Sequence, residues 1–425
     1  MALFRRKKSQ QESSGHSALE LPGAPVDDAS GRRSMDDHRE FLLSLVKPLQ
    51  PFGLSIGDAL GLELCEDVPA PVDVPHLTTA VIDGFALDSA VTTRAGNPYP
   101  VTLQVDRRPP SPVVQGTAVV VRSGEVLPAG VDCVVPAESL DEDGQVSLPA
   151  PVRAWSGCRL AGSDFAAGDA ILAGGRILHP ATVGLLADSG VDKVLARPRP
   201  RVVVLGTGGS RLSSDGLPLP DVTAHLIAAA ATEAGAHVWR VEADGTDREE
   251  LREAITDQLI RADLLLVTAD PALSAGPDPA SELLPELGAT DFCQVAMEPG
   301  GTQGFGLVGP DLVAVMVLPA GPGAALVSFH AFAAPLLRKM GGSIVSAGQQ
   351  VVAEAADILA DPDVPVRFVP VHLRVRAGRT IATRAGRGDA RELVDLAGAD
   401  ALAVIPAGEG VDISDPVTCW PIEQN

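Results

Sequence analysis

Arg201-Val-Val-Val-Leu-Gly-Thr-Gly-Gly209 joins an apolar run to a glycine-rich turn, a pattern typical of a buried strand that ends in a tight loop. The segments downstream alternate between helix and strand signals. They are a helix Asp221–Ala234 closed by Gly235, a strand His237–Val241, a helix opened by Thr246-x-x-Glu249 and ending at Ile260, and a strand Asp263–Thr268. This alternation predicts a parallel sheet with right-handed crossovers.

The same pattern continues through strands at Phe292–Met297 and Leu312–Leu318 to a long helix Pro322–Met340. The flanking regions instead show short β runs broken by Pro and Gly. The expected domains are residues 36–70 with 159–198 as a discontinuous linker domain, 71–158 as a small β-rich domain, 199–342 as an α/β domain, and 343–425 as a C-terminal β domain. The predicted fold class is therefore α/β plus β modules.

Residues 1–35 are polar and carry no hydrophobic period, which predicts a disordered tail. Order is expected from Asp36, which with Asp37 can cap a helix. The tail contains a basic cluster of Arg5, Arg6, Lys7 and Lys8. At about 1 kcal/mol per basic residue, this cluster supports only weak contact with an anionic membrane surface. A solvated tail is the simpler interpretation.

The charge of the chain excludes one class of partner. Lys and Arg number 33 and Asp and Glu number 55, for a net charge of −22. Such a chain repels phosphate backbones, so we expect no nucleic-acid partner. Any anion site must be a local feature.

The cysteines indicate the cellular compartment. None forms a C-x-x-C pair, and the five are Cys65, Cys133, Cys158, Cys293 and Cys419. Widely spaced thiols of this kind are typical of a reducing environment. No apolar run approaches the roughly 18 to 20 residues of a membrane span. We therefore expect a cytoplasmic protein.

Glycine-rich turns follow three of the expected strands. Gly206-Thr-Gly-Gly209 can present backbone N–H groups to a phosphate, but it lacks the third glycine and the following helix of a dinucleotide motif. A phosphate site and a plain tight turn both stay open. Glu298-Pro-Gly-Gly-Thr302 and Leu318-Pro-Ala-Gly-Pro-Gly323 also lie where α/β sheets bind ligands. No lysine occurs between Lys193 and Lys339 to serve these loops.

Three carboxylates lie in loops with turn chemistry. They are Asp83 in Val81-Ile-Asp-Gly-Phe85, Asp164 in Gly162-Ser-Asp-Phe165 and Asp278 in Gly276-Pro-Asp-Pro279. Such residues can bind Mg²⁺ if they converge, although turn or cap duty is their more usual role. The chain has no H-E-x-x-H, G-x-S-x-G or P-loop motif, which excludes those metalloprotease, hydrolase and NTPase classes.

The order of these motifs resembles the molybdopterin molybdenumtransferase (MoeA) family, which includes the gephyrin E domain, from about residue 36 to the end. Three segments carry most of the resemblance. Ala80-Val-Ile-Asp-Gly-Phe-Ala86 is similar to A-M-D-G-Y-A, Arg122–Val135 to T-G-x-x-x-P-x-G-A-D-x-V-V, and Leu205-Gly-Thr-Gly208 to the start of T-G-D-E-L. The later motifs keep their spacing at Pro299-Gly300, Gly304-Phe-Gly306 and Leu318-Pro319.

The resemblance implies an elongated, four-part homodimer with a molybdopterin-binding-like α/β domain that faces the small β domain of its partner. Family members bind adenylylated molybdopterin, use Mg²⁺ to release the adenylate and insert molybdate. Carried over by position, the catalytic residues are Asp83, Ser123 (where the family has Thr), Asp164 and Asp278, with Asp278 also a metal ligand. The implied ligand-binding residues are Thr207, Gly208, Ser210, Pro299, Gly300, Pro319 and Pro322.

Several ligand loops depart from the family pattern. The acidic pair of T-G-D-E-L is Gly209 and Ser210, S-G-G-x-S is Thr268-Ala-Asp-Pro-Ala272, K-P-G-K-P is Glu298-Pro-Gly-Gly-Thr302, and P-G-N-P is Pro319-Ala-Gly-Pro322. Cations are lost and one position reverses its charge. Each lost charge-assisted hydrogen bond is worth about 1.5–3 kcal/mol, so losing two weakens the reaction by on the order of 10² to 10⁴.

Two hypotheses follow from the resemblance and its departures. The first is a molybdenumtransferase with a rearranged and impaired site, which would use Mg²⁺, molybdopterin and molybdate. The second is a catalytically degenerate, gephyrin-like dimeric scaffold that binds a protein or peptide partner, near the membrane or in cell division. The departures fall in the ligand loops while the strand and cap signals remain, which favours the scaffold. A different small-molecule ligand in the same cleft is a third interpretation.

Overall fold

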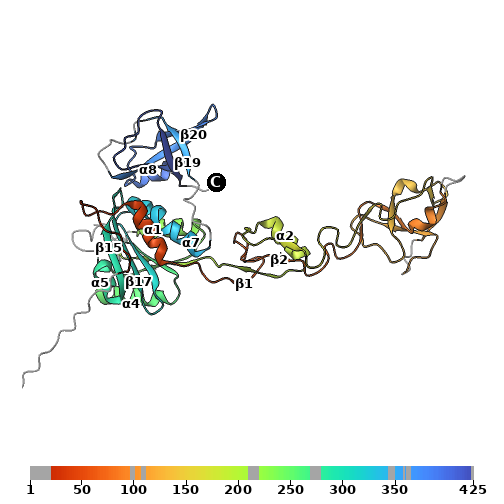
Figure 1. Ribbon diagram of the computed structural model, residues 1–425, viewed down its shortest axis with the longest axis horizontal. Coiled ribbons are helices and arrows are strands. Elements are labelled where there is room, and N and C mark those ends of the chain that lie inside the picture. Colours follow the sequence, from red (N-terminus) through yellow and green to blue (C-terminus); the bar gives the residue numbers. More distant parts are fainter. Residues whose placement is uncertain are drawn as a thin grey trace, which may run out of the picture. The chain divides into compact units, whose positions relative to one another are not determined.

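The computed structural model describes residues 21–95, 101–106, 112–208, 220–268, 279–342, 350–357, 359 and 365–422 (Figure 1). The chain divides into two compact units. Residues 50–198 form one unit, and the described residues before 50 and from 199 onward form the other. The α/β and C-terminal β regions therefore belong to one unit, and the regions between residues 50 and 198 belong to the second.

A six-stranded sheet lies at the centre of the larger unit, in the order β13-β12-β14-β18-β17-β15. Its strands are β12 (Arg201–Gly206), β13 (His237–Glu242), β14 (Leu264–Thr268), β15 (Gly288–Gln294), β17 (Thr302–Val308) and β18 (Val313–Leu318). The first four strands of this order are parallel, as predicted. The remaining two, β17 and β15, run antiparallel to their neighbours.

Strand β17 was not predicted because its sequence is rich in glycine, whereas β15 overlaps the expected strand Phe292–Met297. Gly304 lies opposite Phe292, and a Cβ atom on Gly304 would lie 2.5 Å from the Phe292 ring. A Cβ atom on Gly306 would similarly lie 3.0 Å from a methyl group of Thr290. These glycines indicate close packing across the strands here, rather than the loop that their composition suggests.

Helices cover both faces of this sheet because alternate strand residues point to opposite sides. Val202 and Val204 pack on one face, and Val203 and Leu205 on the other. The first face is covered by α1 (Met35–Leu45), α3 (Val222–Glu233), α6 (Pro322–Ser328) and α7 (Ala334–Met340), with α1 beside α7 in Figure 1; the second is covered by α4 (Arg248–Leu259) and α5 (Pro279–Leu287). A π-helical turn, Phe329–Ala333, separates α6 from α7 where the sequence predicted one continuous helix.

Helix starts show which side chains satisfy the free N–H groups of the first turn. Asp221 caps α3 as predicted, through a 2.8 Å bond to a first-turn N–H. The cap of α1 is Ser34 rather than Asp36 or Asp37. The cap of α4 is Asp247 rather than Thr246, whose hydroxyl instead donates to a neighbouring carboxylate. In both corrected cases a better placed side-chain oxygen lies one to three residues from the predicted cap.

The C-terminal module is a β sheet with a short helix. It comprises β19 (Val351–Ala355), β20 (Val366–Arg376), β21 (Arg379–Arg384), β22 (Ala401–Ile405), β23 (Pro416–Pro421) and α8 (Leu393–Gly398). The order β16-β20-β21-β19-β23-β22, with a further β20–β22 pairing, closes the sheet into a ring. Its outer strand β16 (Met297–Glu298) comes from the α/β region and pairs in parallel with Val366 and Arg367. The two regions of this unit are therefore hydrogen-bonded to each other.

The second unit is built from a five-stranded sheet and three short strand pairs. The sheet, β7-β4-β6-β5-β8, contains β4 (Gly84–Leu87), β5 (Val101–Asp106), β6 (Thr117–Val121), β7 (Cys133–Pro136) and β8 (Gln145–Leu148). The pairs are β1 (Phe52–Ser55) with β11 (Lys193–Ala196), β2 (Val68–Pro69) with β10 (Ala170–Leu172), and β3 (Thr79–Ala80) with β9 (Cys158–Arg159). Helix α2 (Pro180–Asp188) and the 3-10 turns Ser89–Thr92 and Ala137–Ser139 complete it. In each pair a strand from residues 52–80 runs antiparallel to a strand from residues 158–196, so the chain enters and leaves the five-stranded sheet through the same strand pairs.

Residues 21–34 correct the prediction of a disordered tail over 1–35. Leu21 is buried, and the Arg33 backbone bonds to Gln294 and Ala296 at 2.8 Å on both sides. Backbone pairing at Arg33 is one of the contacts that hold this segment, and it leaves no hydrophobic period in the sequence. Residues 1–20, with the predicted membrane-contact cluster Arg5–Lys8, lie outside the described residues. No helix in the described part of the chain has both the length and the apolar character to cross a bilayer.

We predict that Gly84→Ala strongly destabilises the β sheet of residues 84–148. A Cβ atom at this position would lie 1.9 Å from the backbone oxygen of Val135 on the paired strand β7. The strands must separate to accept it, so we expect the free energy of unfolding to fall by about 3 kcal/mol. Chemical denaturation measures the change. Gly57→Ala is the control, because nothing lies within 4 Å of its added Cβ; equal stability of the two variants would contradict the prediction.

Candidate functional site

A cavity of about 1050 Å³ opens at the edge of the central sheet where the parallel strands end. Its wall contains residues that follow β16 and β18, including the predicted ligand residues Pro299, Gly300 and Pro319. Pro365 and Arg391 of the C-terminal module close another side. Ligand pockets of α/β proteins are expected at this edge, and they typically have a volume of roughly 300–1000 Å³.

The loop between β16 and β17 is shaped by its glycine and by a buried hydrogen-bond chain. Gly300 has a φ of 95°, and an added Cβ would lie 3.1 Å from the backbone oxygen of Ala324. The Gln303 amide donates to the Gly300 carbonyl at 2.5 Å and accepts from the Ser328 hydroxyl at 2.8 Å. Gln303 and Ser328 are both fully buried. These two hydrogen bonds hold the floor of the cavity in place. No sequence motif indicated them.

Charged side chains reach the cavity from distant parts of the sequence. Glu298, which stands where the family pattern has Lys, accepts a hydrogen bond from the guanidinium of Arg391. Arg32 also lines the cavity, and its backbone N–H is held by Asp28 at 3.0 Å. Neither Arg32 nor Arg391 was predicted as a ligand residue, because neither belongs to a ligand motif. The reversed charge at Glu298 is thus compensated locally.

The other ligand residues predicted in this unit lie apart from the cavity lining. Thr207 is buried and donates to the Thr268 carbonyl at 2.8 Å, while Gly208 forms an isolated bridge with Asp244. Pro322 begins α6 between two glycines that line the cavity. The predicted residues Ser210 and Asp278 lie outside the described residues.

The predicted catalytic residues Asp83, Ser123 and Asp164 belong to the unit of residues 50–198. The structure brings Asp83 and Ser123 together, since the Ser123 N–H donates to Asp83 Oδ1 at 2.8 Å. The Ser123 hydroxyl donates to the Val81 carbonyl at 2.9 Å. Asp164 instead forms an ion pair with Arg159. Among the described residues, Asp83 Oδ2 has no hydrogen-bond partner, so Asp83 offers a better oxygen ligand for Mg²⁺ than Asp164 does.

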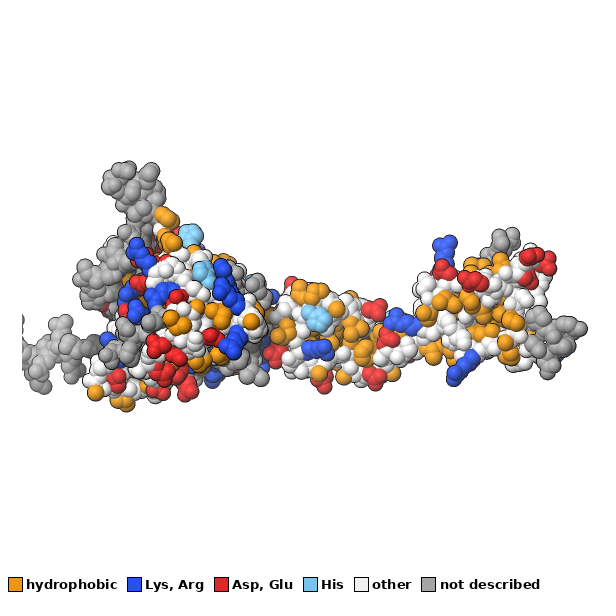
Figure 2. Space-filling view, turned by 90° about the horizontal axis from the view of Figure 1, so that it is seen from above, with side chains coloured by type: hydrophobic (Ala, Val, Ile, Leu, Met, Phe, Trp, Pro, Cys, Tyr) orange, Lys and Arg blue, Asp and Glu red, His pale blue; other side chains and the backbone are white. Residues whose placement is uncertain are grey.

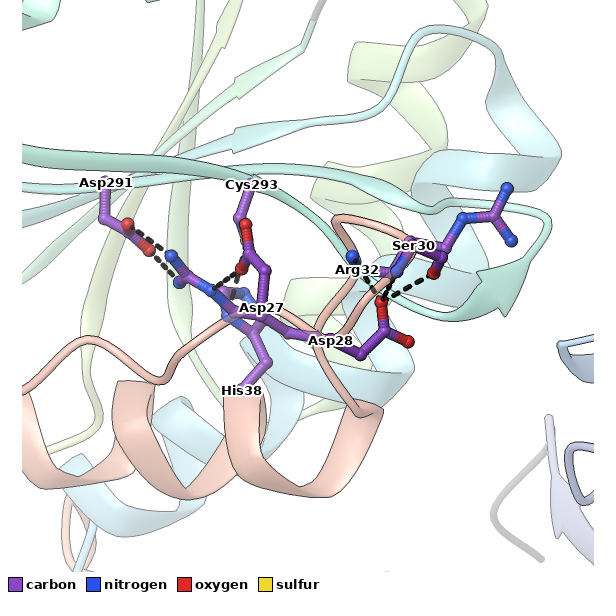
Figure 3. Close-up of polar contacts among 8 residues, drawn as sticks. Asp27, Asp28, Ser30, Arg32, His38, Asp291 and Cys293 are labelled. Carbon is purple, nitrogen blue, oxygen red and sulfur yellow. Dashed lines mark hydrogen bonds and ion pairs between the residues drawn. The ribbon is translucent and has the colours of Figure 1, made fainter.

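A second cluster joins α1 to β15 (Figure 3). Ligand atoms of His38, Asp291 and Cys293 lie within 4.8 Å of one another, with His38 Nδ1 3.7 Å from Cys293 Sγ. Arg33, however, donates to both oxygens of Asp291 and, at 2.9 Å, to Asp27. The Arg33 guanidinium thus occupies the Asp291 carboxylate that a metal ion would need. Burial also raises the pKa of the Cys293 thiol to about 12, which disfavours the thiolate that binds metals. The cluster therefore acts as a clamp that holds the N-terminal segment on the sheet.

Comparison with known proteins agrees with this geometry. Residues 33–190 match the family described as MoeA N-terminal region (domain I and II), and residues 203–339 match the probable molybdopterin binding domain. In Mycobacterium tuberculosis, molybdopterin molybdenumtransferase 1 is 32% identical over 334 residues, covering 72% of this chain and 78% of the relative. Molybdopterin molybdenumtransferase 2 of the same organism is 32% identical over 332 residues, covering 72% and 79%.

Solved structures show the same fold. Two structures of the molybdopterin biosynthesis MoeA protein from Pyrococcus horikoshii superpose with TM-scores of 0.73 and 0.64 at 23% and 20% identity. They cover 93% and 92% of this chain and 100% of their own. The class is thus a multidomain protein with MoeA architecture and an α/β molybdopterin-binding-type domain. The chain belongs to the molybdopterin molybdenumtransferase (MoeA) family.

We predict that acid destabilises the unit that contains the clamp. Burial, and secondly the charge of Arg33, lower the pKa of His38 from 6.5 to about 4. The unfolded chain binds a proton at His38 more readily than the folded chain does. The contribution of neutral His38 to the stability of the folded state is therefore present above pH 6.5 and is lost as the pH falls to 4. We expect a loss of roughly 3 kcal/mol over this range.

The free energy of unfolding, measured by chemical denaturation between pH 7 and 4, tests this sign. His38→Leu should reduce the slope of the curve, because the apolar site beside Phe41 and Phe332 accepts leucine. Part of the slope should remain, because burial also lowers the pKa of His330 to about 4. His76→Leu, at an exposed position, should leave the curve unchanged. A His38→Leu curve as steep as that of the unaltered protein would contradict the assignment.

Proposed function

We propose that this chain is a MoeA-like molybdopterin molybdenumtransferase of molybdenum cofactor biosynthesis and that its α/β domain binds the pterin ligand in the 1050 Å³ cavity. The observation that carries the proposal is the convergence of Pro299, Gly300 and Pro319 on this cavity. These residues come from two separate loops that match ligand motifs of the family. In this proposal the substrates are adenylylated molybdopterin and molybdate.

The charges of each unit support a reaction of anionic substrates. Arg32 and Arg391, in the larger unit, can stabilise oxyanion groups. Asp83, in the unit of residues 50–198, can bind Mg²⁺ through Oδ2. When bound, Mg²⁺ would supply positive charge for phosphate oxygens. Asp83 would hold this ion, while the Ser123 N–H fixes the orientation of its carboxylate.

We expect a slower reaction than that of a relative with lysines in both loops. Arg32 and Arg391 bring two cations to the cavity in place of the two lysines, but the Glu298 carboxylate neutralises one of them. One net missing charge-assisted hydrogen bond corresponds to about 1.5–3 kcal/mol, or on the order of 10- to 10²-fold. The proposal is therefore a working enzyme with reduced efficiency.

We further propose a homodimer formed through the region of residues 71–158. Large apolar side chains are exposed there: Leu77, Val81, Ile82, Val114, Val120, Val126, Leu140 and Trp155. Figure 2 shows hydrophobic side chains gathered on the surface of this region. Exposed apolar groups of this density are typical of an association surface. Light scattering of the purified chain measures the mass directly, and a monomeric mass would contradict this part of the proposal.

The proposed activity is tested by calorimetric titration with adenylylated molybdopterin, in the presence of Mg²⁺ and molybdate. We expect micromolar or tighter binding followed by release of adenylate. A family member with both lysines, tested in parallel, shows that the ligand and the assay are competent. Absence of both heat and adenylate release, with an active control, would contradict transferase function.

We predict that Asp83→Asn lowers Mg²⁺-dependent adenylate release by about 10²-fold or more, because the amide keeps the bond to the Ser123 N–H but loses the charge that binds the metal. Asp141→Asn is a matched control, since Asp141 also accepts a backbone N–H bond, from Gln145, in a loop of the same region. Single-turnover release as a function of Mg²⁺ concentration measures both variants. Equal rates for the two would remove Asp83 from the metal site.

Glu298 motivates a second candidate function. A carboxylate at a lysine position opposes an anionic ligand, which is the feature expected of a cavity no longer used for catalysis. In that case the folded chain would serve as a gephyrin-like scaffold for a protein partner. It would show neither binding nor adenylate release in the calorimetric experiment, while its fold and unfolding cooperativity stayed intact.

A further inference from the structure

Two arginines and one carboxylate line the cavity of this strongly acidic chain. Of the described residues that line it, the charged ones are Arg32, Arg391 and Glu298. Two cations therefore face one carboxylate, whereas the chain as a whole carries a net charge of −22. A concave site with this sign attracts an anion, because cavity walls focus the local field.

Arg391 and Glu298 are both anchored through their backbones. The Arg391 N–H donates to Asp389 Oδ1 at 2.9 Å, and a Cβ added to Gly323 would lie only 2.8 Å from Arg391 Cα. Glu298 belongs to strand β16, whose partner is in the C-terminal module. The two main chains are thus held together by contacts that do not involve the Arg391–Glu298 ion pair. Only the side chains need to move for the pair to separate.

The ion pair itself is exposed enough to exchange easily. The side chains of Arg391 and Glu298 are 56% and 33% exposed, and Arg391 also lies 4.0 Å from Asp389. Exposed ion pairs contribute little stability. A phosphate or molybdate group carries more negative charge than a carboxylate, and a guanidinium can bind such a group through two hydrogen bonds.

We propose that Arg391 is the anion-binding residue of this cavity and that it exchanges from Glu298 to an oxyanion group of the ligand. Glu298 acts as an internal competitor that holds the guanidinium at the cavity until the ligand arrives. This inference rests on the proposed function for the identity of the ligand, but its charge class follows from the lining residues alone. It assigns to the C-terminal module a direct part in binding.

The two partners of the pair should have opposite effects on anion affinity. Titration of the full-length protein with inorganic pyrophosphate, and separately with molybdate, distinguishes a phosphate from a metal oxyanion as the group that is bound. For the anion that binds, we expect Arg391→Ala to weaken affinity about 10-fold or more, because a charge-assisted bond is lost. Glu298→Gln should strengthen affinity about 3-fold, because the competing carboxylate is gone.

Arg376→Ala is the matched control, because Arg376 is an exposed arginine of the same module that does not line the cavity. Its affinity should equal that of the unaltered protein. A purely structural ion pair would be weakened by either change, so parallel losses in Arg391→Ala and Glu298→Gln would overturn the inference. Failure of the unaltered protein to bind either anion would overturn it as well.

These outcomes are separable from those for the proposed function. Opposite shifts in anion affinity without adenylate release would support the role of Arg391 and contradict transferase activity. Adenylate release at equal rates in the unaltered protein and in Arg391→Ala would support the activity and contradict the role of Arg391. Thermal unfolding of each variant identifies any loss of fold, and Glu298→Gln keeps the test decisive if Arg391→Ala is unstable.

Discussion

The pairing of Met297 and Glu298 with Val366 and Arg367 is the constraint on which the candidate site depends. These two residues continue the chain of the α/β region, yet they form a strand of the C-terminal sheet. The module is thereby held against the start of α6, where Gly323 allows the backbones to approach within contact distance. Without this pairing the cavity would lose one side and the sole charge it receives from that module among the described residues.

The cavity combines a rigid floor with an exchangeable wall. Gln303 and Ser328 are buried and hydrogen-bonded to each other, so movement of the floor would leave polar groups without partners, which is costly. Arg391 and Glu298 are partly exposed and can exchange partners with water or a ligand at little cost. The difference follows from burial, and it confines side-chain movement to the exposed side of the cavity.

The sequence predicted those elements whose signals are local. The apolar run at residues 201–205 is a buried strand, and the Asp221 cap forms a bond within its own first turn. Close packing concealed the strand at Gly304, because the glycine that permits contact with Phe292 also resembles a loop residue. Ordered residues 21–34 were equally hidden, since the backbone bonds of Arg33 and its ion pair with the distant Asp291 leave no periodic pattern in the sequence.

Prediction of the site had a corresponding limit. Pro299, Gly300 and Pro319 were identified because each belongs to a contiguous motif after a strand. Arg391 lies 93 positions from Glu298, and nothing in the sequence around either residue indicates the other. The loss of lysines was correctly noted, but its chemical meaning depends on which charges the fold brings close. Only the tertiary structure shows that an arginine compensates for the reversed charge.

The distance between these residues along the chain has an evolutionary consequence. The shape of the cavity is encoded by the α/β region, whereas part of its charge is encoded in an exposed loop of a different module. Substitutions in that loop can alter ligand preference without disturbing the hydrophobic core, since Arg391 is not part of it. Two copies of such a gene could therefore diverge in affinity through single surface changes and retain the same architecture.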